Sequence, residues 1–307
     1  MDAIKTDNLT KRFGNLTAVD GLNLTVAKGE LFGLIGSDGA GKTTIMRMLT
    51  GIMDPSAGSA SVMGRHTVRE AEAIKEEIGY MSQRFGLYPD LTVLENIHFY
   101  ADIYGLARKG REERIDRLLS FSSLAPFKKR QAGNLSGGMK QKLGLVCALI
   151  HTPQVLFLDE PTNGVDPVSR REFWRILHQL LKEGVTIFVA TAYLDEADRC
   201  HRVGLIHQGK LLACDRPDLL RGLMKGAILE IHTDNARKTA LLLRERIPDA
   251  SVGLFGDRLH LAIDDPARGT ELVTETMKQA GMNLRGIRQI EPSLEDVFVS
   301  VLGREQE

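Results

Sequence analysis

Cysteine, net charge and long apolar runs are all scarce in this sequence of 307 residues. The three cysteines, Cys147, Cys200 and Cys214, are scattered and form no CxxC pair, so neither a disulfide framework nor a zinc site is expected. Such cysteine usage suits a reducing cytosol. The 40 basic and 40 acidic residues balance, so no global charge draws the chain to nucleic acid or to an anionic membrane.

Apolar segments are equally limited in length. The stretch 1–7 has no apolar core and does not have the pattern of a signal peptide. No apolar run approaches the length needed to cross a bilayer. If the protein moves something through a membrane, we therefore expect another chain to supply the membrane part.

The first half of the sequence predicts strands, a glycine loop and then helices. Residues 1–30 favour β-strands broken by glycine turns, and Leu31 to Ile35 is a short apolar strand that leads into the loop. Beyond the loop, apolar residues at helical spacing predict a helix with Ile45, Met48, Leu49 and Ile52 on one face. Residues 83–150 are mainly helical in pattern. Apolar strands at 155–158 and 186–189 then alternate with a helix, which favours a parallel sheet covered on both faces.

The pattern changes after Arg216-Pro217. From Ala227 onward the order strand, helix, strand, strand, helix, strand is predicted, which is the ferredoxin-like βαββαβ arrangement. A last helix follows Ser293, a plausible N-cap with Asp296 three residues on. We place the domain boundary near 223, giving domains 1–223 and 224–307.

The segment Gly36-Ser37-Asp38-Gly39-Ala40-Gly41-Lys42-Thr43 fits the phosphate-binding pattern G-x-x-x-x-G-K-T. Its glycines let backbone N–H groups point inward at phosphate oxygens, and the following helix presents its positive end to them. Lys42 would reach the terminal phosphates, and the Thr43 hydroxyl would bind Mg²⁺. The alternative, a chance glycine-rich turn, does not explain the strand and helix on either side.

Two carboxylates, Asp159 and Glu160, end the apolar strand 155–158. Asp159 would hold Mg²⁺ through water, and Glu160 would act as the general base toward the attacking water. A helix-capping acidic pair before Pro161 is the alternative. The position downstream of a phosphate loop favours the catalytic interpretation.

Ser136-Gly137-Gly138, within Leu135 to Gln141, starts a helix whose N–H groups and serine hydroxyl suit an anion. Ser136 could equally be a simple N-cap. One nucleotide does not need two separate anion sites in one chain.

The three motifs, in this order, resemble the ATP-binding subunit of an ABC transporter. The resemblance implies an α/β P-loop NTPase core with antiparallel β and helical subdomains, plus a small C-terminal α+β ferredoxin-like domain. It also implies a head-to-tail pair, in which the serine-glycine motif of one subunit closes over ATP on the phosphate loop of the other.

The resemblance assigns further residues by position. Phe13 matches the aromatic residue that stacks on adenine, although core packing is the alternative. Gln83 matches the glutamine that senses Mg²⁺ and faces the membrane partner. Asp166 matches an aspartate that contacts the opposite subunit, and it could also cap the helix that begins at Pro167.

Together these assignments give the expected site. The catalytic residues are Glu160, Gln83 and Lys42, and the Mg²⁺ ligands are Thr43, Gln83 and Asp159. The ATP-binding residues are Phe13, Gly36, Ser37, Asp38, Gly39, Ala40, Gly41, Lys42, Thr43, Thr44, Ser136, Gly137, Gly138 and Asp166.

Two positions depart from the family pattern. Ala192 stands before Tyr193 where the family places a histidine that bonds the γ-phosphate, and an alanine methyl cannot do so. Slower hydrolysis, rescue by another group, or a natural sub-family without this histidine would each account for it, and we favour the third. Ser37-Asp38 replaces the commoner Pro-Asn, and backbone cradling should survive that change.

The tail Glu291 to Phe298 resembles that of ATPase subunits in drug and antibiotic-resistance exporters, in which a small extension supports dimerisation or regulation. We therefore expect an ATP-hydrolysing subunit that powers export, with ATP and Mg²⁺ as cofactors. Expected partners are a second ATP-binding subunit and an integral membrane subunit, with no nucleic acid. The expected location is cytoplasmic, peripheral on the membrane. The alternatives are a soluble ABC ATPase acting on ribosomes or DNA, and a nucleotide-gated module with weak turnover because of Ala192.

Overall fold

The computed structural model describes residues 1–304 except 84–85, 225 and 249. Its contacts divide the chain into two compact units, Met1–Cys214 and Asp215–Glu307. This division falls earlier than the boundary near 223 that composition suggests. The short helix α7 (Pro217–Arg221) accounts for the difference, because it packs against the last helix of the chain and so belongs to the second unit.

The first unit is built on a six-stranded sheet with the order β10-β9-β3-β8-β7-β6. Strands β9, β3, β8, β7 and β6 pair in parallel, and every residue of β3, β7 and β8 is buried. Both faces of these apolar strands are therefore covered, as the sequence predicts. The strands are β3 (Leu31–Ile35), β6 (Ile78–Met81), β7 (Val155–Asp159), β8 (Thr186–Thr191), β9 (Arg202–His207) and β10 (Lys210–Asp215).

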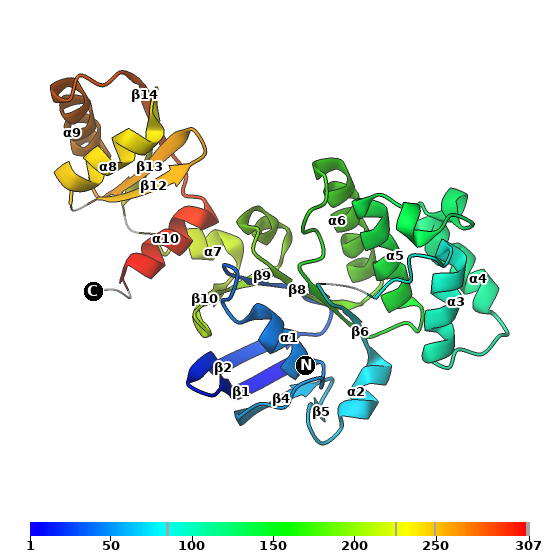
Figure 1. The fold of residues 1–307 in the computed structure, drawn as a ribbon. Coiled ribbons are helices and arrows are strands. Elements are labelled where there is room, and N and C mark those ends of the chain that lie inside the picture. Colours follow the sequence, from blue (N-terminus) through cyan, green and yellow to red (C-terminus); the bar gives the residue numbers. More distant parts are fainter. Residues whose placement is uncertain (84–85, 225, 249, 305–307) are drawn as a thin grey trace. The chain divides into compact units, whose positions relative to one another are not determined.

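An antiparallel sheet of order β2-β1-β4-β5 forms a second layer of this unit (Figure 1). Strands β1 (Asp2–Phe13) and β2 (Leu16–Ala27) are the predicted β-rich opening. Strands β4 (Ala57–Val62) and β5 (Arg65–His66) were not predicted, since small and polar residues dominate them. One apolar core is shared by this sheet, helix α1 and the parallel sheet.

The helices of the first unit lie mainly between residues 93 and 182. Figure 1 shows α3, α4 and α5 grouped on one side, and α5 contacts both α3 and α6. The α-helices are α1 (Lys42–Leu49), α2 (Ala71–Glu77), α3 (Val93–Ile103), α4 (Arg111–Phe121), α5 (Gly137–Leu149) and α6 (Pro167–Lys182). The 3₁₀ turns are η1 (Ala125–Phe127), η2 (Ala132–Asn134) and η3 (Leu194–Arg199). The prediction that Ile52 belongs to the first helix was wrong: α1 ends at Leu49, and Ile52 is exposed beyond the Gly51 turn.

The second unit contains a sheet with the order β12-β13-β11-β14, in which neighbouring strands are antiparallel. Its elements follow the predicted βαββαβ order, and α8 and α9 pack on the sheet around a separate apolar core. They are β11 (Ala227–Thr233), α8 (Ala236–Arg246), β12 (Ser251–Phe255), β13 (Arg258–Ile263), α9 (Pro266–Gln279), β14 (Leu284–Ile290) and α10 (Leu294–Arg304).

The tail motif forms the start of α10. The Ser293 hydroxyl accepts a hydrogen bond from the Asp296 N–H, and Asp296 Oδ2 accepts from the Ser293 N–H, so the expected cap is present. Asp296 Oδ1 also lies 2.8 Å from His260 Nδ1 of β13. The motif therefore fixes the last helix to its sheet.

Candidate functional site

The loop 36–41 joins the carboxyl end of β3 to the first turn of α1 and wraps around one lysine. Lys42 is buried, and its Nζ donates hydrogen bonds to the carbonyl oxygens of Gly36 at 2.8 Å and Ser37 at 3.1 Å. A Cβ at Gly36 would lie 2.3 Å from the Ile206 carbonyl oxygen. Gly41 has φ +105°, which only glycine adopts without strain. The glycines are therefore required for the loop to close on the lysine.

The carboxyl end of β7 brings two acids to the same place. Asp159 and Glu160 are 1% and 5% exposed, and Glu160 has a positive φ of 52°. The Thr43 hydroxyl donates to Asp159 Oδ1 at 3.2 Å, and Lys42 Nζ lies 3.0 Å from Glu160 Oε1. Residues 116 positions apart in the chain therefore form one charged cluster, because β3 and β7 end at the same edge of the sheet.

This cluster contains a buried oxygen acceptor without a hydrogen-bond partner in the part of the chain that the structure describes. Asp159 Oδ2 is buried and has no hydrogen-bond partner among the described residues, and Glu160 Oε1 is buried with the Lys42 ammonium beside it. Burial raises the pKa of Asp159, and the neighbouring Glu160 charge raises it further, whereas the Thr43 hydrogen bond and Lys42 act in the opposite direction. Buried oxygens without partners are rare in folded proteins and often indicate an ion or ligand. Oxygen donors of this kind fit a hard cation such as Mg²⁺.

A cavity of about 390 Å³ opens above the cluster. The predicted site residues that line it are Phe13, Asp38, Gly39, Gly41, Lys42, Thr43, Thr44, Gln83 and Glu160. Gly36, Ser37 and Ala40 shape the loop from behind, through the Lys42 hydrogen bonds and a bond from the Ala40 N–H to the Ser37 carbonyl. Phe13 is 46% exposed at the rim, which argues against the core-packing alternative for its ring.

Sequence reasoning missed two lining residues, Leu16 and Ala18. Both lie on β2, which pairs with β1 so that Leu16 is opposite Phe13. The Ala18 carbonyl oxygen would lie 2.4 Å from a Cβ at Gly41. The hairpin therefore forms one wall of the cavity. The β-rich pattern predicted for residues 1–30 was a signal for it.

Ser136, Gly137, Gly138 and Asp166 lie together at a different place. Ser136 is exposed and caps α5 by accepting a hydrogen bond from the Met139 N–H at 3.3 Å. Asp166 is exposed and caps α6 through the N–H groups of Val168 and Ser169. A Cβ at Gly138 would lie 2.4 Å from the Ser169 Cβ, so the two helix starts touch. None of the four lines the cavity as the described residues form it.

Ala192, which stands where the family has a histidine, contacts Glu160 through its backbone. The Ala192 N–H donates to Glu160 Oε2 at 3.2 Å. The backbone of this residue, rather than a side chain, therefore holds the carboxylate that lies beside Lys42.

Comparisons with known proteins identify the family. A family model described as ABC transporter matches residues 19–163. The Nod factor export ATP-binding protein I of Rhizobium sp. (strain N33) is 37% identical over 312 residues, covering 99% of this chain and 98% of the relative. The chain belongs to the ABC transporter family of ATP-binding proteins.

A second ABC relative is longer than this chain. The probable multidrug ABC transporter ATP-binding protein YbhF of Escherichia coli (strain K12) is 43% identical over 308 residues. That match covers 98% of this chain and 52% of the relative, so the chain spans about half the length of this relative.

The fold agrees with solved ABC cassettes. The dimeric structure of MJ0796, a bacterial ABC transporter cassette, superposes with a TM-score of 0.64 at 26% identity. The superposition covers 69% of this chain and 98% of that one. The P-loop core with antiparallel and parallel sheets that the sequence predicts is therefore confirmed.

Proposed function

We propose that this chain is the ATP-binding and ATP-hydrolysing subunit of an ABC exporter whose membrane-spanning part is a separate chain. The observation that carries the proposal is the cluster of Lys42, Thr43, Asp159 and Glu160 beneath a cavity that also contains Phe13 and Gln83. A phosphate loop, an Asp159 oxygen unpartnered among the described residues, a carboxylate at Glu160 and an exposed aromatic ring form the set that binding and hydrolysing a nucleoside triphosphate requires.

Each residue has a role in this proposal. Lys42 and the N–H groups of residues 39–44 bind the phosphates, and the Phe13 ring stacks on the adenine. Thr43, Asp159 and Gln83 would hold Mg²⁺, which supplies charge neutralisation on the phosphates. Lys42 turns from Glu160 toward the phosphates when ATP binds. Glu160 is then free to accept a proton from the attacking water.

Ala192 fits this role for Glu160. The Ala192 N–H orients Glu160 Oε2 and leaves Oε1 facing Lys42 and the cavity. A base oriented by the backbone N–H keeps its position whatever side chain stands at 192, although this bond does not replace the histidine contact with the γ-phosphate. This arrangement supports turnover, and it favours the sub-family interpretation over a nucleotide-gated module.

We propose that the complete pocket needs two subunits. Ser136 and Gly137 are exposed at a helix N-terminus, where N–H groups attract an anion, and they lie outside the cavity above Lys42. The second copy, or a close relative of this chain, would place its Ser136 over the phosphates. MJ0796, the cassette solved as a dimer, supports this arrangement.

A membrane partner is proposed because the relatives are named as ATP-binding proteins of Nod factor export and of a multidrug ABC transporter. No helix among the described residues is long and apolar enough to cross a bilayer. A groove of about 920 Å³ between α2, β6 and α3 offers a docking place beyond Gln83. Its apolar and aromatic lining includes Tyr80, Ile103 and Tyr104, and the Tyr104 ring stacks on His151 at 3.7 Å between ring centroids. The location on the cytoplasmic face of the membrane belongs to this proposal.

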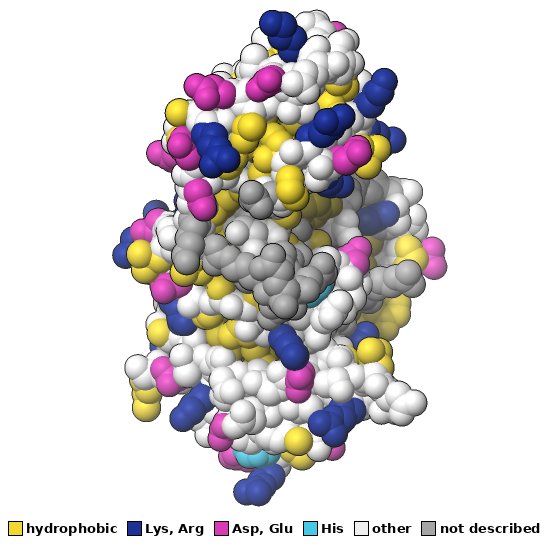
Figure 2. All heavy atoms as spheres, turned by 90° about the vertical axis from the view of Figure 1, so that its left-hand side faces the viewer, with side chains coloured by type: hydrophobic (Ala, Val, Ile, Leu, Met, Phe, Trp, Pro, Cys, Tyr) yellow, Lys and Arg dark blue, Asp and Glu magenta, His cyan; other side chains and the backbone are white. Residues whose placement is uncertain are grey.

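Separate observations support the proposals of export and of no nucleic-acid partner. The names of the two relatives, a Nod factor export protein and a multidrug transporter protein, favour export. On the face drawn in Figure 2, lysine and arginine side chains are mixed with aspartate and glutamate side chains. That face offers no basic patch for nucleic acid. We propose that the second unit is accessory, since it has its own core.

Lys42→Ala tests the proposal. The purified variant should lose ATP affinity by about a hundredfold or more, because the buried cation contacts the terminal phosphates. Lys129→Ala is the matched control, since Lys129 is exposed and far along the chain from the loop. Nucleotide affinity that is equal in both variants would contradict the proposed function.

A further inference from the structure

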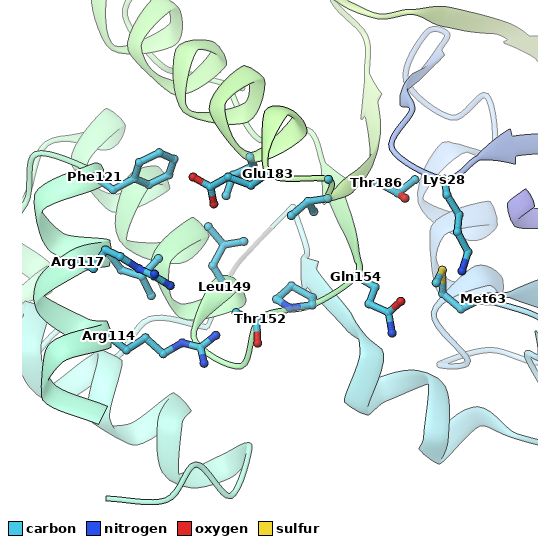
Figure 3. Close-up of a pocket in the computed structure, with 15 residues that line it drawn as sticks. Lys28, Met63, Arg114, Arg117, Phe121, Leu149, Thr152, Gln154, Glu183 and Thr186 are labelled. Atoms are coloured by element: carbon cyan, nitrogen blue, oxygen red, sulfur yellow. The ribbon is translucent and has the colours of Figure 1, made fainter. Parts of the chain in front are cut away.

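Another cavity, of about 430 Å³, is drawn in Figure 3. It lies at the edge of the parallel sheet opposite the nucleotide site. Gln154, which directly precedes β7, and Thr186, the first residue of β8, both line it. The nucleotide-site residues follow the carboxyl ends of the same strands. Five residues of β7 separate the two edges, a length of about 16 Å.

The walls of this cavity are mostly apolar, but its charge is positive. Arg114 and Arg117 of α4 extend toward Leu149, the last residue of α5, and Thr152 in the turn after it (Figure 3). Lys28 lies on the far side beside Met63 (Figure 3). The single carboxylate in the lining is Glu183. The apolar wall is formed by Leu118, Phe121, Leu149, Pro153, Leu180 and Val185.

Among the cations of this cavity, Arg114 has side-chain nitrogens without a hydrogen-bond partner in the described part of the chain. Its Nε and Nη2 atoms are buried and have no hydrogen-bond partner among the described residues. Burial lowers the pKa of Arg114, and the Arg117 charge lowers it further. A partly buried guanidinium without a counter-charge costs free energy that a nearby anion would partly recover.

We propose that this cavity binds a small amphiphilic carboxylate, with its anionic head on the Arg114 guanidinium and its apolar body against the Leu149 wall. A carboxylate is the natural counter-charge of a guanidinium and accepts charge-assisted hydrogen bonds from it. The volume is within the range of small-molecule sites. The apolar wall and the Glu183 charge favour a monoanion over a phosphate dianion.

The ligand would join two parts of the first unit. Arg114 and Phe121 belong to the helical segment that follows Gln83, whereas Val185 directly precedes β8 of the central sheet and Thr186 is its first residue. A bound carboxylate would therefore brace α4 against the sheet without touching the nucleotide. This site does not depend on the proposed ATPase activity.

Calorimetric titration of the full chain with octanoate tests the proposal, with octanamide as the uncharged probe of the same shape. Octanoate should bind saturably with a Kd of about 1 mM or tighter, and octanamide at least about tenfold more weakly. Arg114→Gln should weaken octanoate binding about tenfold or more. Lys109→Gln, which removes an exposed cation just before α4, should leave it unchanged.

A second variant covers the case in which Arg114→Gln does not fold. Val185→Trp fills the cavity from the α6–β8 turn, keeps Arg114 and should abolish octanoate binding. ATP affinity and thermal midpoint verify that each variant is folded. No saturable octanoate binding, equal affinity for octanamide, or unaltered binding by either folded variant would overturn the proposal.

Discussion

Two buried carboxylates, Glu160 and Glu230, lie beside cations, one in each unit, and their surroundings differ in what is left unpaired. Glu230 Oε1 accepts from Arg288 Nε at 2.6 Å and lies 2.8 Å from His232 Nε2, while Oε2 accepts from Arg258. Glu160 Oε1 has only the Lys42 ion pair, and the adjacent Asp159 Oδ2 has no hydrogen bond among the described residues. A saturated network of this kind serves the fold, whereas buried acceptors to spare indicate a site for a ligand.

The strongest way to break this comparison is to neutralise Glu160. Glu160→Gln should lower the rate of ATP hydrolysis by about 10²–10⁴-fold, because a positioned general base contributes that much. ATP affinity should remain, since Lys42 and the loop N–H groups are unchanged. Phosphate release and nucleotide binding by the same preparation measure both quantities. Hydrolysis at the wild-type rate would assign the base to another residue.

The Lys42–Glu160 ion pair should also contribute to the free energy of unfolding. Lys42→Ala leaves a buried carboxylate without its cation and should lower the free energy of unfolding by about 3–5 kcal/mol. The double variant Lys42→Ala/Glu160→Gln should recover much of this loss, because the remaining side chain is neutral. Denaturant unfolding of the three proteins provides the test. Equal destabilisation in the single and double variants would show that the pair is not coupled.

Glu230→Gln should have the opposite profile, with ATP hydrolysis preserved and the free energy of unfolding lowered by about 1–2 kcal/mol. The effect is smaller because Arg258 and Arg288 are 46% and 62% exposed, and solvent screens them. The hydrogen bond from Arg288 lowers the pKa of Glu230 to about 2. A depressed acid pKa stabilises the folded state above the unfolded-state value, and the gain is lost as pH falls toward 2.

Denaturant unfolding at pH 7 and at pH 2.5 measures this profile. Wild type and Glu230→Gln should differ less at the lower pH. If the difference in unfolding free energy between wild type and Glu230→Gln is the same at both pH values, Glu230 has no electrostatic role in stability. Loss of ATP hydrolysis in folded Glu230→Gln would contradict the assignment of the Glu230 network to the fold alone.

The sequence predicted motifs formed by consecutive residues and missed contacts between segments that are far apart in the chain. The phosphate loop was recognisable because consecutive residues form its cage, and Asp159-Glu160 because an apolar strand precedes them directly. The contact between Lys42 and Glu160 could not be predicted, since it depends on where β3 and β7 end in the folded sheet. The arginine-lined cavity was missed for the same reason, because separate segments form it.

The same distinction explains the details of the fold. The βαββαβ order was predictable because alternating and helical spacings are read within each element. The position of α7 was not, because its assignment to the second unit rests on packing against α10 at the other end of that unit. Strand β4 lacks an apolar alternation and is held by its pairing with β1.

The central claim is that one ATP is enclosed by Lys42 of one chain and Ser136 of another. The most direct measurement is ATP hydrolysis by an equal mixture of a Ser136→Glu protein and a Lys42→Ala protein. Each alone should be inactive. The mixture should regain about a quarter of wild-type activity, since half of the pairs are mixed and each has one intact pocket of two. A mixture as inactive as its components, although the two proteins pair, would contradict the account.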